Sequence, residues 1–199
     1  MQAFLGGFDR DLVWGLRDYT AACVMLETGA RVGEICNLEE SDFKWDVGLV
    51  NLDGKTGERL VPFDKERIET LIKNWLRIRP RYATKVFISR YGGNTTPDTF
   101  RQAFADNLKN VSGLRASLGK NTISCHTLRH FYCTHYLVNG GSLHNLQRIT
   151  GHKDVNTLMI YVNLANQIPT VREEANRVSP LKSLLDKEPM KKRKTVKLG

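Results

Sequence analysis

The hydrophobic positions of this chain recur mostly at steps of three and four residues, the spacing that places side chains on one face of an α-helix. The first such segment ends before Gly29, which stands where a helix C-terminal glycine is expected. Its apolar residues are Leu12, Leu16, Tyr19, Cys23 and Leu26. The same spacing predicts helices over 31–38, 64–79, 97–111 and 127–139, and another that begins at Leu143.

Short apolar runs interrupt this periodicity and predict β-strands. Residues 49–52 and 60–63 flank a glycine-containing connection, which is typical of a β-hairpin, with Lys55 on or beside its turn. Residues 86–88 are a candidate third strand, and residues 113–121 are predicted to form a loop. The resulting fold class is α+β, mainly α, with a helical domain and one small antiparallel β-sheet.

The end of the chain differs in character from the rest. A chain of 199 residues can bury one sizeable core, so we expect residues 1–167 to form a single domain. Beyond it, an apolar stripe at helical spacing precedes Pro180 and consists of Ile168, Val171, Ala175 and Val178. A basic run starts at Lys191. We interpret residues 168–199 as a C-terminal helix with a solvated basic tail, with a nuclear-import signal as the alternative for the basic run.

Composition and charge narrow the choice of partner. The chain is 41% hydrophobic and 26% charged, which is ordinary for a globular domain. It carries 30 Lys and Arg against 21 Asp and Glu, a net charge of +9, and such an excess suits a nucleic acid. The four cysteines lack paired spacing and indicate reduced thiols, while no apolar run reaches the ~20 residues that span a bilayer. We therefore expect a cytoplasmic protein that binds no membrane.

Several motifs carry residues suited to phosphodiester chemistry. Arg31 follows a Thr-Gly-Ala sequence, Arg129 lies within His-Thr-Leu-Arg-His, and His152 precedes Tyr161 by nine positions. Arginine binds two phosphate oxygens at once with its planar fork and keeps its charge. Histidine exchanges protons near neutral pH, and tyrosine can act as a nucleophile that forms a covalent phosphotyrosine. Together these residues predict an enzyme that cuts and rejoins DNA.

Motif by motif, the chain resembles the catalytic domain of the tyrosine recombinase (phage integrase) superfamily. The resemblance rests on TGARVGEI at 28–35, GKTGERLVP at 54–62, HTLRH at 126–130, and Gly151-His152 with Tyr161. It covers roughly residues 10–165, with the motifs in the family's order. It implies the tyrosine recombinase catalytic fold and DNA cleavage through a 3′-phosphotyrosine.

The resemblance also implies roles for individual residues. Arg31 and Arg129 would bind the scissile phosphate, and His152 would bond one of its oxygens. Glu34, one helical turn after Arg31, is better interpreted as a structural residue that orients Arg31 or His130.

Proton transfer is implied for three further residues. Tyr161 would be the nucleophile, His126 its general base, and Lys55 the general acid for the leaving 5′-hydroxyl. The alternative for Lys55 is a solvated turn residue. His130 is expected to pack and hydrogen-bond inside the protein. His126 and His130 have the spacing of a zinc helix, but Thr127 stands where that motif needs glutamate, so we expect no metal and no cofactor.

The chain departs from the family pattern in three places. Thr150 stands where the family usually carries leucine, and Leu158 replaces a common threonine. Neither change is expected to touch a catalytic role. About ten residues precede the first predicted helix, where the family normally has an N-terminal DNA-clamping domain, so the chain resembles an excised catalytic domain or a natural short form.

Three functions from different classes compete. The favoured one is a site-specific recombinase of a phage or mobile element, acting on double-stranded DNA as a homo-oligomer, a tetrameric synapse. The second is a type IB topoisomerase-like enzyme, which uses a similar residue set without choosing sites. The third is a DNA-binding accessory protein without catalysis, against which the intact Arg31, Arg129, His126 and Tyr161 argue.

Overall fold

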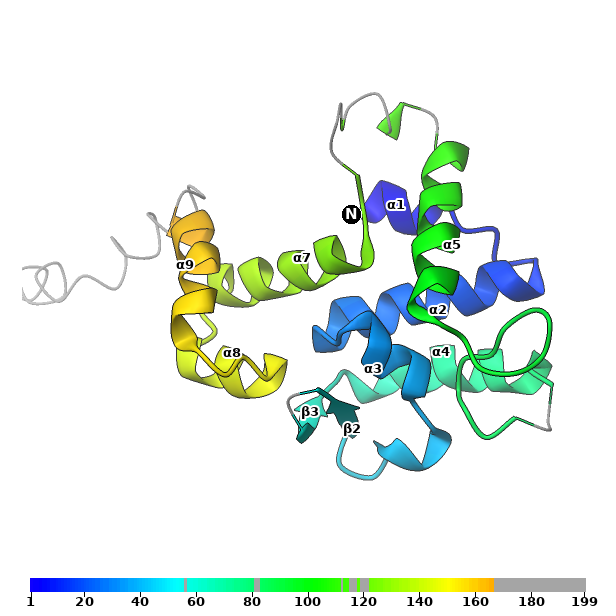
Figure 1. Cartoon of the computed structure of the whole chain (residues 1–199), viewed down its shortest axis with the longest axis horizontal. Helices are drawn as coiled ribbons and strands as arrows, with labels where there is room; N and C mark the ends of the chain where they lie inside the picture. Colours follow the sequence, from blue (N-terminus) through cyan, green and yellow to red (C-terminus); the bar gives the residue numbers. More distant parts are fainter. Residues whose placement is uncertain (56, 81–82, 112, 115–117, 119–121, 167–199) are drawn as a thin grey trace, which may run out of the picture.

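The computed structural model describes residues 1–55, 57–80, 83–111, 113–114, 118 and 122–166. Helices form most of it, together with a small antiparallel sheet (Figure 1). The α-helices are α1 (Gln2–Gly6), α2 (Val13–Thr28), α3 (Val32–Asn37), α4 (Lys65–Ile78), α5 (Pro97–Asn110), α7 (Cys125–Val138), α8 (Leu143–Thr150) and α9 (Met159–Asn166). The strands are β1 (Phe43–Lys44), β2 (Leu49–Gly54) and β3 (Gly57–Pro62), and short 3-10 helices are η1 (Glu40–Asp42) and η2 (Val155–Leu158). The predicted fold class is confirmed.

The ends of several helices follow from their capping residues. Gly29 ends α2 with a left-handed backbone, φ 64°, which glycine adopts without steric cost. The Asp64 side chain accepts from the backbone N–H of Arg67 at 3.2 Å and begins α4, as predicted. Ser124 caps α7 in the same way, so this helix begins two residues before the predicted position.

The predicted third strand is wrong. The sheet has the order β1-β2-β3, and β2 pairs with β3 so that Val50 lies opposite Val61. Residues 86–88 stay outside this sheet, and the N–H of Val86 donates to the carbonyl of Leu38 at 2.7 Å. Their side chains are buried in the core, and Phe87 packs edge-on against Phe100. The apolar run therefore indicated burial rather than a strand, a distinction that periodicity cannot make for so short a segment.

Helix α2 lies at the centre of the main core. It packs against α3, α4, α5 and α7, so several of its faces are covered. The apolar stripe expected to be buried is instead its partly exposed side, and Leu12 just before the helix is 61% exposed. The fully buried positions include the small or flexible Ala21, Val24 and Met25. Close packing on several sides favours such residues over a single large stripe.

A smaller hydrophobic cluster forms where α7 meets α8, η2 and α9. Its buried residues are Cys133, Leu146, Leu158 and Tyr161. Figure 1 shows α8 and α9 on one side of the molecule, joined to the other helices by α7. Helix α7 therefore connects two cores, because its residue Leu128 belongs to the main one. This arrangement places the residues of the two later motifs beside each other.

Some predictions fall where the structure gives no description. The C-terminal helix and tail over 168–199 lie outside the described residues, as does most of the predicted loop over 113–121. Of that loop, Leu114 and Leu118 pack against the main core. No helix in the described part of the chain is long and apolar enough to cross a membrane.

Candidate active site

Three arginines meet at the C-terminal end of α8. The consecutive backbone carbonyl oxygens of residues 149–151 accept from Arg59 at 2.7 Å, Arg129 at 2.6 Å and Arg31 at 3.1 Å, in that order. Carbonyls at the end of a helix have no partner within it and carry the negative end of its dipole. The end of α8 thereby gathers three guanidinium groups that come from β3, α7 and the start of α3.

Glu34 joins two of these arginines. Its carboxylate accepts from Arg59 at 2.7 and 2.8 Å and from Arg31 at 3.1 Å. Burial opposes its charge, but the hydrogen bonds and charges of Arg59 and Arg31 outweigh burial and lower the pKa of Glu34. A carboxylate fixed in this way orients both guanidinium groups, so the predicted structural role of Glu34 fits its contacts with Arg31.

Arg129 is buried and bridges two helix ends. Its guanidinium donates to the carbonyl of Gly29, which caps α2, at 2.6 Å, in addition to its bond at the end of α8. Burial, reinforced by the positive charge of Arg31, lowers its pKa to about 10. Arg129 is still charged at neutral pH, and its position is fixed before any ligand arrives.

His152 stands directly after the three carbonyls. Its Nε2 lies 3.4 Å from Nη2 of Arg129, and its Nδ1 lies 2.6 Å from the hydroxyl oxygen of Thr150. Burial and the charges of Arg129, Arg31 and Arg59 lower the pKa of His152 to about 4. The ring is therefore neutral at neutral pH. The contact also bears on the expectation that the change at Thr150 touches no catalytic role, because His152 is one of the predicted site residues.

Tyr161 reaches this region from α9. It is 4% exposed, and its ring lies 5.3 Å from the ring of His130 and 6.4 Å from that of His152, centroid to centroid. Burial, together with the adjacent Cys133 thiol, raises the pKa of Tyr161 to about 12. In this conformation the hydroxyl is protonated and shielded from solvent.

The two histidines of the His-Thr-Leu-Arg-His box differ in placement. His130 was expected inside the protein, but its side chain is exposed and its ring lies against Tyr161. The contact with Tyr161 shields part of the ring, and this shielding, with the charges of His126 and Arg129, lowers the pKa of His130. His126 is exposed in the first turn of α7, about 10 Å along the helix axis from Cys133, which lies beside the tyrosine hydroxyl. The structure thus brings His130 rather than His126 to Tyr161.

Lys55 lies on the turn between β2 and β3 and is exposed, in agreement with the predicted hairpin. The preceding Gly54 approaches Glu34 so closely that a Cβ atom there would lie 2.6 Å from the Glu34 carboxylate. A glycine is therefore required where the hairpin crosses this carboxylate. The contact places the turn with Lys55 next to the arginine cluster.

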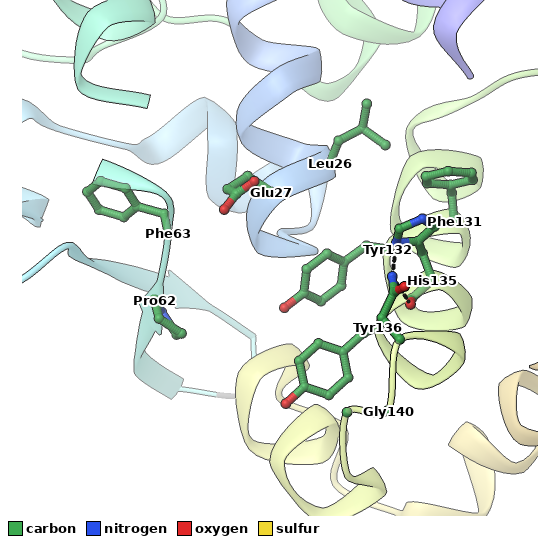
Figure 2. Close-up of a pocket in the computed structure, with 11 residues that line it drawn as sticks. Leu26, Glu27, Pro62, Phe63, Phe131, Tyr132, His135, Tyr136 and Gly140 are labelled. Carbon is green, nitrogen blue, oxygen red and sulfur yellow. Dashed lines mark hydrogen bonds between the residues drawn. The ribbon is translucent and has the colours of Figure 1, made fainter. Parts of the chain in front are cut away.

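A separate hollow of about 590 Å³ lies between α2, β3 and α7 (Figure 2). Figure 2 shows Tyr132 and Tyr136 extending from α7 into it. None of the six predicted catalytic residues, all of them in the described part of the chain, lines this hollow. Burial raises the pKa of Tyr132 even further than that of Tyr161. The candidate active site is therefore the arginine cluster and not this hollow.

Sequence reasoning missed Arg59 and Thr150. Arg59 stands two residues before the buried Val61 on β3, and alternate residues of a strand share one face. That alternation could have placed Arg59 toward the protein interior. For Thr150, the departure from the usual leucine was visible, but its contact with His152 depends on the helix ending at Gly151.

The arrangement suits a singly or doubly charged oxyanion. Three guanidinium groups gather at the end of α8 and one carboxylate pairs with two of them, which leaves a positive excess there. Arg31 has a side chain 30% exposed and offers the accessible part of that charge. In the described part of the chain, no three His, Cys, Asp or Glu side chains gather as a metal site requires. A phosphodiester matches this charge and the bidentate geometry of arginine.

Comparisons with known proteins agree with this chemistry. The model of the phage integrase family matches residues 11–167. Tyrosine recombinase XerD of Staphylococcus aureus (strain Mu50 / ATCC 700699) is 32% identical over 178 residues, which cover 86% of this chain and 58% of that protein. The crystal structure of XerA recombinase matches with a TM-score of 0.73 and 26% identity, over 90% of this chain and 62% of that one.

A likeness of fold alone extends to the Tn1549 transposon integrase in complex with transposon right end DNA. The TM-score is 0.70 at 19% identity, over 89% of this chain and 63% of that one. The chain spans less than two thirds of the length of each of these three proteins. The family match covers well over half of the chain and includes the arginine cluster and Tyr161. The chain therefore belongs to the phage integrase family, the tyrosine recombinase superfamily that its motifs resemble.

Proposed function

We propose that this chain is the catalytic domain of a site-specific DNA recombinase or integrase that uses Tyr161 as its nucleophile. The observation that carries the proposal is the cluster of Arg31, Arg129 and His152 at the end of α8, with Tyr161 packed beside it from α9. The cluster supplies fixed positive charge for a phosphate, and the neighbouring helix supplies a hydroxyl. Both are needed for a covalent phosphotyrosine.

The proposed reaction conserves the energy of the phosphodiester bond. The Tyr161 oxygen bonds to phosphorus and passes its proton to a base, for which we propose His126. The bond from phosphorus to the 5′-oxygen breaks, and this oxygen takes a proton from an acid, for which we propose Lys55. Arg31 and Arg129 stabilise the charge that develops on the non-bridging oxygens, and His152 bonds one of them. Attack by a free 5′-hydroxyl on the phosphotyrosine reverses these steps and rejoins DNA.

This mechanism requires Tyr161 to move. Its hydroxyl is buried beside Cys133, whereas His126 lies about two helical turns away along α7. The nucleophile must therefore leave the small cluster before it can attack a phosphate held by Arg31 and Arg129. We propose that binding of DNA drives this movement.

We propose double-stranded DNA as the partner, bound by several copies of the chain in a tetrameric synapse of a phage or mobile element. The net charge of +9 supports a polyanionic partner. The fold is also that of a transposon integrase solved with transposon end DNA. We further propose that residues 168–199 pack on a neighbouring copy on DNA, or fold back over their own domain when DNA is absent. Truncation after Asn166 should weaken cooperative assembly in a gel-shift assay while single-site cleavage is retained; unchanged assembly would contradict this packing.

The test is trapping on nicked DNA. The protein is incubated with a pool of nicked duplexes that carry a randomised segment, so that cleavage releases a short strand and prevents rejoining. Wild-type protein should form a covalent adduct that survives detergent and maps by peptide sequencing to Tyr161. Tyr161→Phe should bind DNA and form no adduct. An adduct on another tyrosine would refute the assignment, and DNA binding without any adduct would favour the accessory function.

The choice of DNA sequence distinguishes a site-specific recombinase from the topoisomerase-like alternative. Adducts recovered from the randomised pool should share a sequence if the chain is a site-specific recombinase. A topoisomerase-like enzyme would yield adducts without a shared sequence and would relax supercoiled plasmid. Thus one pool distinguishes the three functions.

A further inference from the structure

Thr150 is the last residue of α8 and makes two contacts with catalytic candidates. It is fully buried, and its backbone carbonyl accepts from Arg129 at 2.6 Å. Its hydroxyl oxygen lies 2.6 Å from Nδ1 of His152. Leucine, the residue expected at this position from the family resemblance, has no side-chain oxygen and could not make the second contact.

The direction of this hydrogen bond follows from counting protons. The Thr150 hydroxyl has one proton, and it donates that proton to the carbonyl of Leu146 at 2.6 Å. Toward His152 the hydroxyl can then act only as an acceptor. Nδ1 must therefore carry the ring proton, and in the neutral ring Nε2 must be bare. A bare Nε2 agrees with its other neighbour, because Arg129 can donate to it and cannot accept.

This tautomer conflicts with the proposed task of His152. To bond a phosphate oxygen, a ring nitrogen must donate a proton, and the nitrogen that faces Arg129 has none to give. Moving the ring proton to Nε2 would require the Thr150 hydroxyl to give up its bond to the carbonyl of Leu146 and donate to Nδ1 instead. While the Thr150 hydroxyl keeps its bond to Leu146, the ring can donate from Nε2 only when both nitrogens hold a proton.

We propose that Thr150 is a positioning residue that holds His152 as its Nδ1–H tautomer, so that His152 donates to the scissile phosphate only after Nε2 has taken up a proton. The proposal rests on the proposed function, because it concerns the phosphate site of that reaction. A bound phosphodiester supplies the negative charge that favours the imidazolium. In the free protein the positive neighbours Arg129, Arg31, Arg59 and the adjacent His130 oppose it, and burial lowers the pKa of His152 to about 4.

The proposal predicts that the donating form of His152 becomes more common as pH falls. The pKa of His152 is low without phosphate and rises when phosphate binds, so binding takes up a proton between these two values. The fraction of complexes with a donating His152 therefore grows as pH falls through that window. Tyr161, which also faces His152, has a pKa raised to about 12 and does not titrate there. Titration of His130 would affect wild-type protein and Thr150 variants alike.

The first test uses free protein and no DNA. Two-bond proton–nitrogen correlation spectra of the imidazole rings show which nitrogen of each histidine carries the proton, and His152→Asn identifies the His152 signals. At neutral pH, wild-type protein and Thr150→Ser should show the proton on Nδ1. Thr150→Val, which keeps the shape and loses the acceptor, should show a population with the proton on Nε2. A wild-type ring protonated on Nε2, or an unchanged ring in Thr150→Val, would overturn the proposal.

The second test measures the rate of adduct formation at saturating DNA, using a nicked duplex recovered from the randomised pool. Thr150→Val should react about tenfold more slowly at neutral pH, because its His152 ring loses the hydrogen bond that orients it; the loss of such a bond behind a metal-binding histidine costs about 10- to 100-fold. Thr150→Ser should restore the rate. The ratio of wild-type to Thr150→Val rates should fall as pH rises, because the valine variant can donate from a neutral ring. If the ratio of the two rates does not change with pH, the proposed uptake of a proton by His152 is wrong.

Thr20→Val is the matched control. Thr20 is also fully buried and also donates to the carbonyl four residues earlier, that of Leu16, at 2.8 Å. Its replacement removes the same kind of hydrogen bond far along the sequence from His152 and should leave both the spectra and the pH profile unchanged. Failure of any duplex to form an adduct would count against the proposed function, whereas the spectra of free protein decide the tautomer in either case.

Discussion

Replacing Arg59 by methionine tests whether the buried ion pair between Arg59 and Glu34, beside the candidate active site, stabilises the fold. Arg59 donates two hydrogen bonds to Glu34 and one to the carbonyl of Ile149, and the two charged side chains are 9% and 1% exposed. Methionine keeps an unbranched aliphatic chain but removes the charge and all three donors. Glu34 would keep its bond to Arg31, and the end of α8 would lose its link to β3.

The burial of the ion pair determines how much the substitution should lower the free energy of unfolding. Removing one partner of a buried ion pair costs about 3–5 kcal/mol, and the remaining bond to Arg31 favours the lower end, about 3 kcal/mol. Arg67→Met is the matched control, because Arg67 also pairs with a carboxylate, that of Asp64, but the two side chains are 84% and 42% exposed. An exposed pair of this kind contributes at most ~0.5 kcal/mol.

Urea unfolding followed by circular dichroism measures both variants. With a slope of about 2 kcal/mol per molar urea, Arg59→Met should lower the midpoint by about 1.5 M and Arg67→Met by less than ~0.3 M. The lowered pKa of Glu34 determines how the stability of the wild-type protein depends on pH. Its carboxylate stabilises the fold above the ordinary glutamate pKa, and this stabilisation is lost as pH falls through the lowered value. The difference between wild type and Arg59→Met should shrink in that acid range. Equal midpoints for both variants would refute the reasoning.

Three further outcomes test the catalytic assignments. Arg129→Lys should slow adduct formation nearly as much as Arg129→Ala, by roughly 10²-fold or more, because an ammonium lacks the planar fork; near-normal cleavage would rule out the bidentate clamp. Lys55→Ala should fail on ordinary DNA but cleave a 5′-bridging phosphorothioate, whose sulfur leaves without an acid; equal loss on both substrates would make Lys55 a solvated turn residue. The Cys133 thiol, buried with Tyr161, should react with a maleimide in the trapped adduct but not in free protein, while buried Cys36 stays protected in both. A Cys133 that stays protected in the adduct would show that Tyr161 does not leave the small cluster.

Most of the helices were predictable because local signals agreed with packing, whereas α1 and α9 were not predicted. Asp64 and Gly29 cap their helices through bonds within a few residues, which a sequence displays directly. The hairpin followed from two apolar runs around a glycine-containing turn. Residues 86–88 show the limit, since burial from several sides makes an irregular segment as apolar as a strand.

The motifs predicted which residues meet but not how they are held. Arg31 and Arg129 do converge, yet the groups that fix them are backbone carbonyls at the end of α8, which no side-chain pattern announces. His130 was assigned to the interior from its helical spacing. Its exposure and its contact with Tyr161 depend on how α9 packs on α7, a long-range contact that neither helix encodes by itself.

The structure combines a fixed arginine cluster, the proposed phosphate site, with a buried Tyr161, the proposed nucleophile. Arg129 is fixed by carbonyls from α2 and α8 and needs no ligand to reach its position, so phosphate binding should require little rearrangement there. Tyr161, in contrast, is packed among Cys133, Leu146 and Leu158, and its hydroxyl is protonated at any physiological pH. Substitutions in the arginine cluster should therefore act on phosphate binding and on the chemical step. Substitutions in the small cluster should instead change how often Tyr161 becomes available for the proposed reaction, and strand cleavage would then depend on whatever moves α9.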